Sequence, residues 1–257
     1  MACGLASRYR GLPSRVRQST NSVVQRLPVT AAGRGLRYMR WAKRFATFAD
    51  LDEEAAFRRS YSLYAPDELV GLLSPQLRPD IDSVLEWHRQ VYEDTPFSEP
   101  VNRMCLADTR MFLPGLNLTY TDRASMAAST EVRVPFVDPT VFRAAFSLRS
   151  KEKVSTRHGK LALKKVAEAW LPKEIVYRPK ASFSAPLRSW VTRDLREVID
   201  EALLRGELVE TGFLNRPAVL ALVEEDRAGR QDRSKQIWQL LTLELWYRTT
   251  LRAGVEL

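Results

Sequence analysis

From about residue 52 onward, the hydrophobic and polar positions of this 257-residue chain follow the spacing of helices. Apolar residues recur every three or four positions, and prolines and capping residues divide the chain at short intervals. Asp52 is predicted to be the N-cap of a helix that ends near Tyr64. Further helices are predicted over 66–73, 82–92, 101–113, 139–148, 160–170, 187–205, 216–228 and 233–251.

Strands are nearly absent from this pattern. Residues 132–136, Val-Arg-Val-Pro-Phe, predict a strand, because they are β-branched and contain a proline that a helix interior does not tolerate. Residues 114–117, Pro-Gly-Leu-Asn, predict a turn. The helix over 233–251 is apolar around much of its circumference, which predicts burial. The chain is therefore expected to be mainly α, with one large or two small domains.

Charge is distributed unevenly along the chain. Residues 1–49 contain nine arginines, one lysine and no acidic residue, whereas the other 208 residues hold 30 basic and 31 acidic side chains. This basic segment is interpreted as helices with solvated charged faces, with a transit peptide or a nucleic-acid arm as the alternatives. Leu36, Met39, Ala42, Phe45 and Ala49 mark an apolar helical face within it.

Several classes of protein are excluded or disfavoured. No apolar run reaches the length of a membrane span, and no secretory leader is visible. Cys3 and Cys105 are too far apart to suggest a metal site or a disulfide framework, which favours two reduced thiols and a cytoplasmic location. Walker, dinucleotide-binding, H-E-x-x-H and C-x-x-C motifs are absent. His88 is interpreted as a surface or hydrogen-bonded residue.

Residues 122–138, DRASMAASTEVRVPFVD, place five charges in a segment that otherwise looks suited to burial. Asp122 is interpreted either as a helix N-cap or as part of a site. Glu131 and Arg133 share a face if the chain is extended, and they could pair with each other. Lys160 follows Gly159 at a helix start, where the helix dipole disfavours a cation, so it is either exposed or directed at an anion.

These blocks resemble one family. The segment from Asp122 to Asp138, the pair Gly159-Lys160 and the segment from Leu171 to Trp190 are similar to motifs in the C-terminal half of glutamine-dependent asparagine synthetases. The sequence IWQLLTLELW at 237–246 is similar to that family's closing helix. The resemblance covers roughly residues 100–250. It implies a helical C-terminal half of an α/β ATP-pyrophosphatase-type synthetase domain, with the parallel-sheet core largely missing.

The resemblance implies ATP-dependent amidation of aspartate. ATP and Mg²⁺ would adenylate the side-chain carboxylate to a β-aspartyl-AMP intermediate, and ammonia derived from glutamine would then displace AMP. By motif match, the catalytic residues would be Lys160, on the departing pyrophosphate, and Asp122, beside the acyl intermediate. The residues that bind the substrate or nucleotide would be Arg123, Ser125, Met126 and Lys180. Glu131 and Arg133 would have a structural role, with no metal ligand assigned.

The chain also departs from the family's pattern. It contains no S-G-G-x-D-S nucleotide loop, and the residues after Cys3 do not follow the glutaminase pattern, so Cys3 is not expected to be a nucleophile. The whole of 1–257 is therefore expected to be a partial synthetase domain that is inactive alone, with another polypeptide or a homodimer as the partner that would complete it. Its parts would be a basic helical segment (1–50), a helical segment (51–113), a motif-bearing segment (114–191) and C-terminal helices (192–257). The alternatives are a related amidotransferase for another carboxylate and a non-catalytic helical interaction module with a basic arm.

Overall fold

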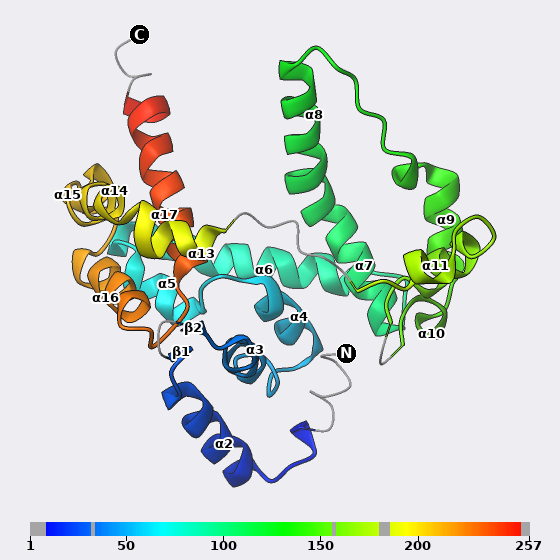
Figure 1. Ribbon diagram of the computed structural model, residues 1–257, viewed down its shortest axis with the longest axis horizontal. Helices are drawn as coiled ribbons and strands as arrows, with labels where there is room; N and C mark the ends of the chain where they lie inside the picture. Colours follow the sequence, from blue (N-terminus) through cyan, green and yellow to red (C-terminus); the bar gives the residue numbers. More distant parts are fainter. Residues whose placement is uncertain (1–8, 32–33, 156–157, 180–185, 253–257) are drawn as a thin grey trace. The chain divides into compact units, whose positions relative to one another are not determined.

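The computed structural model describes residues 9–31, 34–155, 158–179 and 186–252 (Figure 1). The chain divides into two compact units. Unit 1 is built on residues 85–181, and unit 2 on residues 6–84 and 182–257. Helix α6 (Pro79–Glu93) begins in unit 2 and ends in unit 1. Among the described helices, none combines the length and apolar composition that a membrane crossing requires.

The first part of unit 2 consists of short helices and one small hairpin. Strands β1 (Thr30–Ala31) and β2 (Arg34–Gly35) pair antiparallel. The other elements are the helices α2 (Ser14–Arg26), α3 (Arg37–Ala46), α4 (Glu53–Tyr61) and α5 (Pro66–Leu72) and the 3-10 helix η1 (Pro75–Leu77).

Two predictions for this region are confirmed. The Asp52 carboxylate accepts a hydrogen bond from the backbone N–H of Ala55 at 2.8 Å, so Asp52 is the N-cap of α4. On α3, Phe45 lies on the predicted apolar face and stacks on Trp41 with ring centroids 5.3 Å apart. Ala49, which continues this face beyond the helix, is completely buried. The basic segment therefore packs into unit 2 through its apolar side.

The second part of unit 2 carries the main hydrophobic core. Helices α16 (Arg216–Arg227) and α17 (Ser234–Trp246) supply several of the least exposed side chains, including Val219, Val223 and Ile237. Each buried aliphatic side chain of this size contributes roughly 1.5–3 kcal/mol relative to an exposed one. The remaining elements are the helices α13 (Leu187–Ser189), α14 (Arg196–Ile199) and α15 (Glu207–Glu210) and the π-helices η4 (Trp190–Asp194), η5 (Asp200–Leu204) and η6 (Tyr247–Arg252).

The two sequence-distant parts of unit 2 are joined by backbone hydrogen bonds. Leu73 and Leu214 form an isolated antiparallel bridge, and the N–H of Asn215 donates to the carbonyl of Leu72 at 2.9 Å. Leu72 itself belongs to the core cluster. This bridge fixes α5 against the C-terminal helices.

Unit 1 is helical throughout its regular structure. Asn102 is buried and ties two segments together, since it accepts a hydrogen bond from the Lys153 ammonium and donates one to the carbonyl of Leu148. Its elements beyond α6 are the helices α7 (Pro100–Arg110), α8 (Thr119–Ala127), α9 (Pro139–Ser147), α10 (Ser150–Lys153), α11 (Leu161–Ala167) and α12 (Lys173–Val176), the π-helix η2 (Leu113–Leu118) and the 3-10 helix η3 (Pro135–Val137).

Three local predictions are wrong. Residues 114–117 lie within the π-helix η2 instead of forming a turn, and Pro114 is tolerated because it occupies the first turn, where an N–H is not needed. The predicted strand over 132–136 does not form: residues 132–134 have no regular structure, and Pro135 begins the 3-10 helix η3. In the described chain, no strand or bridge pairs with this segment. Helix α17 is buried along one face only, and Trp238 and Trp246 on it are 39% and 47% exposed.

The prediction that the chain is mainly α is confirmed. His88, interpreted as either a surface residue or one whose polar groups have partners, is only 4% exposed, so the surface alternative is wrong. It does interact within the structure, where its charge lies close enough to Asp108 to affect that carboxyl.

Candidate functional site

The predicted site residues near 122–126 lie on helix α8. Asp122 is in the first turn of this helix, but Leu118 is its N-cap, so Asp122 has no capping role. Asp122, Ser125 and Met126 share one helical face, because they are three and four positions apart. Ser125 Oγ donates to the Asp122 carbonyl oxygen at 3.0 Å, which leaves the Asp122 carboxylate out of this bond.

The expectation that the segment 122–138 is buried is wrong. Asp122 and Arg123 are exposed, and Met126 is 56% exposed. Helix α8 ends at Ala127, and Ser129 takes a left-handed conformation with φ 52°, after which residues 130–134 have no regular structure. Burial would need a partner layer over this segment, and the described part of unit 1 does not supply one.

The predicted pairing of Glu131 with Arg133 is confirmed. Arg133 Nε donates to Glu131 Oε1 at 2.9 Å. The side chains are 69% and 85% exposed, so this pair contributes little to stability. Asp138, the last charge of the segment, is the N-cap of α9 and accepts from the Thr140 N–H at 2.7 Å. This hydrogen bond lowers the pKa of the Asp138 carboxyl.

Lys160 is the N-cap of helix α11, one position before its predicted place in the first helical turn. Its backbone is left-handed, with φ 58° and ψ 39°, a conformation that costs a residue with a Cβ roughly 1–2 kcal/mol. The preceding Gly159 forms an isolated bridge with Val154. This bridge closes the loop before α11 and leaves the Lys160 side chain exposed.

The predicted residues of unit 1 do not converge in this structure. In the described chain, no hydrogen bond or ion pair joins Lys160 to Asp122 or Arg123. Figure 1 draws α11 close to α10 and α8 apart from both. Lys180, the other predicted binding residue, lies outside the described residues, as does Cys3.

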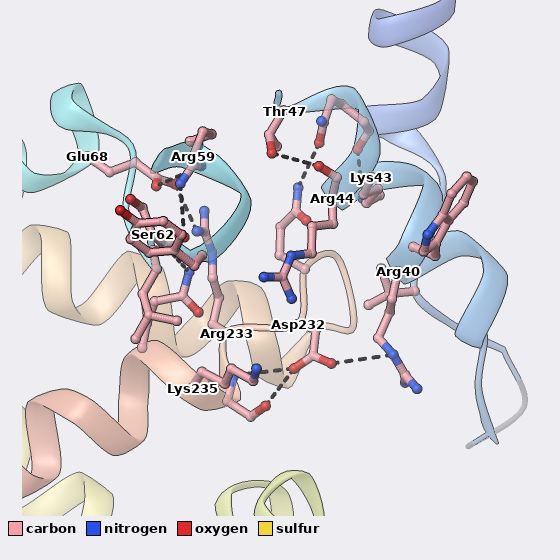
Figure 2. Close-up of a pocket in the computed structure, with 18 residues that line it drawn as sticks. Arg40, Lys43, Arg44, Thr47, Arg59, Ser62, Glu68, Asp232, Arg233 and Lys235 are labelled. Carbon is pink, nitrogen blue, oxygen red and sulfur yellow. Dashed lines mark hydrogen bonds and ion pairs between the residues drawn. The ribbon is translucent and has the colours of Figure 1, made fainter. Parts of the chain in front are cut away.

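A separate pocket of about 600 Å³ lies entirely within unit 2 (Figure 2). Helix α3, the end of α4 and the first turn of α17 line it. Six of the lining residues are cationic, and two are acidic. The cations are Arg40, Lys43, Arg44, Arg59, Arg233 and Lys235, and the acids are Glu68 and Asp232.

Lys43 is the most deeply buried cation of this pocket. It is only 5% exposed, and its Nζ donates to the carbonyls of Gln25 at 2.8 Å and Arg230 at 2.7 Å. Burial lowers the pKa of the Lys43 ammonium, an effect that the charge of Glu225 opposes. These two hydrogen bonds use two of the three N–H donors of the ammonium.

Arg233 has the opposite arrangement. It forms ion pairs with Glu68 and Glu225, each at 2.8 Å. Burial alone would lower the pKa of its guanidinium, but the two carboxylates outweigh burial and raise it. The Arg233 charge is therefore satisfied within the protein.

Sequence reasoning did not identify this pocket. Arg40, Lys43 and Arg44 belong to the basic segment, whose charges were interpreted as solvated. The available signal was a helix with four basic residues between 37 and 44 and no acid nearby to neutralise them. The partners from α17 are about 190 positions away, and only folding brings them together.

Comparison with known proteins decides the family. A family model described as asparagine synthase matches residues 3–248. The chain belongs to the asparagine synthase family. The match extends the resemblance over nearly the whole chain, including the basic segment. No solved structure matches this family member.

Two relatives illustrate the similarity. The chain is 30% identical, over 92% of its length, to a protein of Mycobacterium tuberculosis named "Putative asparagine synthetase, glutamine-hydrolyzing". It is 29% identical, over 60% of its length, to asparagine synthetase (glutamine-hydrolyzing) 1 of Bacillus subtilis. These matches cover 34% and 24% of the two relatives. The chain therefore spans about a third of the length of the first relative.

Proposed function

We propose that this chain forms the C-terminal part of the synthetase domain of a glutamine-hydrolysing asparagine synthetase. The reaction is ATP-dependent amidation of aspartate. A side-chain carboxylate oxygen of aspartate bonds to the α-phosphorus of ATP, and pyrophosphate leaves with the electrons of the broken P–O bond. Ammonia then bonds to the activated carbon, its nitrogen loses a proton, and AMP leaves with the electrons of the broken C–O bond.

In this proposal Lys160 stabilises the negative charge that builds up on the departing pyrophosphate. The supporting observation is its backbone conformation. A lysine held at φ 58° is strained, and residues kept in such conformations cluster at functional sites. Glycine would adopt this conformation without strain, so the presence of lysine favours a role for the side chain.

Asp122 is proposed to lie beside the nucleotide and the incoming amine, with Arg123, Ser125 and Met126 along the same wall. Asp122, Arg123 and Met126 are exposed on α8 and Ser125 is partly exposed, so these side chains are accessible to substrate or to another segment of the enzyme. Lys180 is proposed as a further nucleotide contact. Glu131 and Arg133, which pair with each other, keep a structural role at the corner after α8.

The described residues do not fit a resident Mg²⁺ site. No group of three or more His, Cys, Asp or Glu side chains gathers in the described part of the chain. The printed sequence also contains no S-G-G-x-D-S motif. We therefore propose that the metal ligands and the nucleotide loop lie on another segment or polypeptide, which acts together with this one.

The test measures pyrophosphate release from ATP, aspartate and ammonium ions. The chain is assayed alone and together with a polypeptide that carries the unmatched two thirds of the Mycobacterium tuberculosis relative. Release is expected only from the mixture, and Lys160→Ala is expected to lower it at least 100-fold. Lys173→Ala removes another exposed lysine of unit 1 and serves as the matched control.

Equal activity of the Lys160→Ala and Lys173→Ala mixtures would contradict the role of Lys160. Replacing aspartate by other carboxylates in the same assay tests the alternative of a related amidotransferase. Amide formation with aspartate and with none of the other carboxylates would support the synthetase assignment.

A further inference from the structure

The cations of the unit 2 pocket outnumber the carboxylates that could neutralise them. Glu68 pairs closely with Arg233, at 2.8 Å, and only loosely with Arg59, at 4.0 Å. Asp232 lies 3.5 Å from Arg40, but it also pairs with Arg188 at 2.8 Å. Both acids of the pocket are therefore shared between cations.

Three lining cations have no carboxylate at ion-pair distance within the described chain: Lys43, Arg44 and Lys235. Lys43 donates to two neutral carbonyls, and Arg44 donates to the carbonyl of Ser60. Figure 2 shows the Arg44 guanidinium extending from α3 toward the segment before α17 that contains Asp232.

Lys43 points most directly to a ligand. Charged side chains are rarely buried without a counter-ion, because desolvation of an unpaired ammonium is costly. The Lys43 ammonium nevertheless lies at 5% exposure with only carbonyl partners, and it lines an open pocket. An anion in the pocket would accept its third N–H and would supply the missing negative charge.

The number of unneutralised cations sets the charge of this ligand. A single carboxylate would balance one of the three, whereas a diphosphate group carries enough charge for all of them. Guanidinium groups also match phosphate oxygens in a two-pronged geometry. Trp41 and Tyr61 add aromatic surface to the lining, and the volume of about 600 Å³ leaves room for an organic group beside the phosphates.

We propose that the pocket between α3, the end of α4 and the start of α17 binds a small molecule that carries a diphosphate group. This site lies within unit 2, whereas Lys160 and Asp122 belong to unit 1. The inference therefore does not rest on the proposed catalytic role of those residues.

Calorimetric titration of the full chain with inorganic pyrophosphate tests the proposal. Saturable 1:1 binding is expected, and Arg44→Gln is expected to weaken it at least tenfold. Arg205→Gln is the matched control, because Arg205 is an exposed arginine of unit 2 that does not line the pocket; it should change affinity less than twofold. Lys43→Met should also weaken binding at least tenfold. If that variant fails to fold, Arg44→Gln decides, since its side chain is exposed.

Lys160→Ala separates this site from the proposed catalytic one. Unchanged pyrophosphate affinity in Lys160→Ala, together with the loss in Arg44→Gln, would support the unit 2 pocket. A loss of pyrophosphate affinity in Lys160→Ala, with unchanged affinity in Arg44→Gln, would overturn the proposal. The absence of saturable binding would also overturn it, as would equal weakening of binding by Arg44→Gln and Arg205→Gln. A parallel titration with ADP tests whether the ligand has an organic group. Tighter binding of ADP than of pyrophosphate would indicate an organic diphosphate, and tighter binding of pyrophosphate would indicate the inorganic ion.

Discussion

Gly206 lies directly against the carboxylate of Glu244, and no larger residue fits between them. A Cβ built on Gly206 would lie 2.8 Å from Cδ of Glu244 and 1.9 Å from the carbonyl oxygen of Ala202. Glu244 is 1% exposed, and its two oxygens accept the backbone N–H groups of Glu207 at 2.7 Å and Leu208 at 3.0 Å. This buried carboxylate of α17 therefore holds the start of α15.

Gly206→Ala is expected to lower the free energy of unfolding by about 3 kcal/mol or more. The new methyl group meets backbone atoms of Ala202, which cannot move aside without displacing η5. Urea denaturation followed by circular dichroism measures the change. Gly71→Ala is the control, because its Cβ would meet nothing within 4 Å in helix α5 and should stabilise by about 0.5–1 kcal/mol. Equal effects of the two variants would contradict the close approach.

Glu244→Gln is expected to lower the free energy of unfolding by about 2 kcal/mol. The amide keeps the shape of the side chain but has one acceptor oxygen, so its NH₂ group must face a backbone N–H that loses its partner. Urea denaturation again gives the value. Glu201→Gln, at an exposed position of η5, should change stability by less than about 0.5 kcal/mol. A change as small in Glu244→Gln would show that the carboxylate is replaceable.

At position 160, glycine is expected to be more stable than alanine. Lys160→Gly removes the strain of a Cβ at φ 58°. The free energy of unfolding of this variant should therefore be about 1 kcal/mol higher than that of Lys160→Ala. Within helix α11 the order should reverse, with Lys164→Ala more stable than Lys164→Gly. Thermal or urea denaturation of the four variants checks both orders. The same order at both positions would contradict the left-handed conformation of Lys160.

Asp226 predicts a pH dependence of stability. Its side chain is 1% exposed, and burial raises the pKa of its carboxyl, although the N–H of Arg233 at 2.8 Å and the guanidinium of Arg188 at 3.3 Å oppose this. Because the folded state holds this proton more tightly than the unfolded state, the contribution is complete below the unfolded pKa. It is lost as pH rises through the higher folded pKa.

The measurement compares wild type with Asp226→Asn, which has no titrating group at this position. The difference in free energy of unfolding, wild type minus variant, is expected to fall as pH rises from about 4 to 7. Urea denaturation at several pH values provides the difference and cancels groups common to both proteins. A difference that rises over this range would show that the Arg188 and Arg233 contacts dominate over burial.

The helix boundaries show how far local signals reach. Asp52 was predicted as an N-cap and is one, because its carboxylate needs only an N–H three residues away. Pro66 and Pro139 begin helices as predicted, since proline fits a first turn. The pair Glu131–Arg133 also needed only two neighbouring residues. Interactions within a few positions of the chain were therefore predictable.

The candidate sites depended on longer-range information. The segment 122–138 mixes five charged residues with small and apolar ones, and the same composition suits either a buried wall or an exposed segment. Only the presence of a covering layer distinguishes the two, and the described part of unit 1 leaves this segment exposed. The strand at 132–136 failed for the same reason, because a strand requires a partner that no local pattern supplies.

By itself, the sequence determined the helical class of this chain, most of its helix starts and, through ordered motifs, its family. The helical class and the helix starts follow from capping, proline geometry and apolar spacing, which act over a few residues. Only the tertiary structure decided that Lys43 is buried beside Arg230 and that Gly206 meets Glu244. Such contacts join residues far apart in the chain. They depend on how the helices pack, because packing decides which side chains meet and which charged groups are buried together.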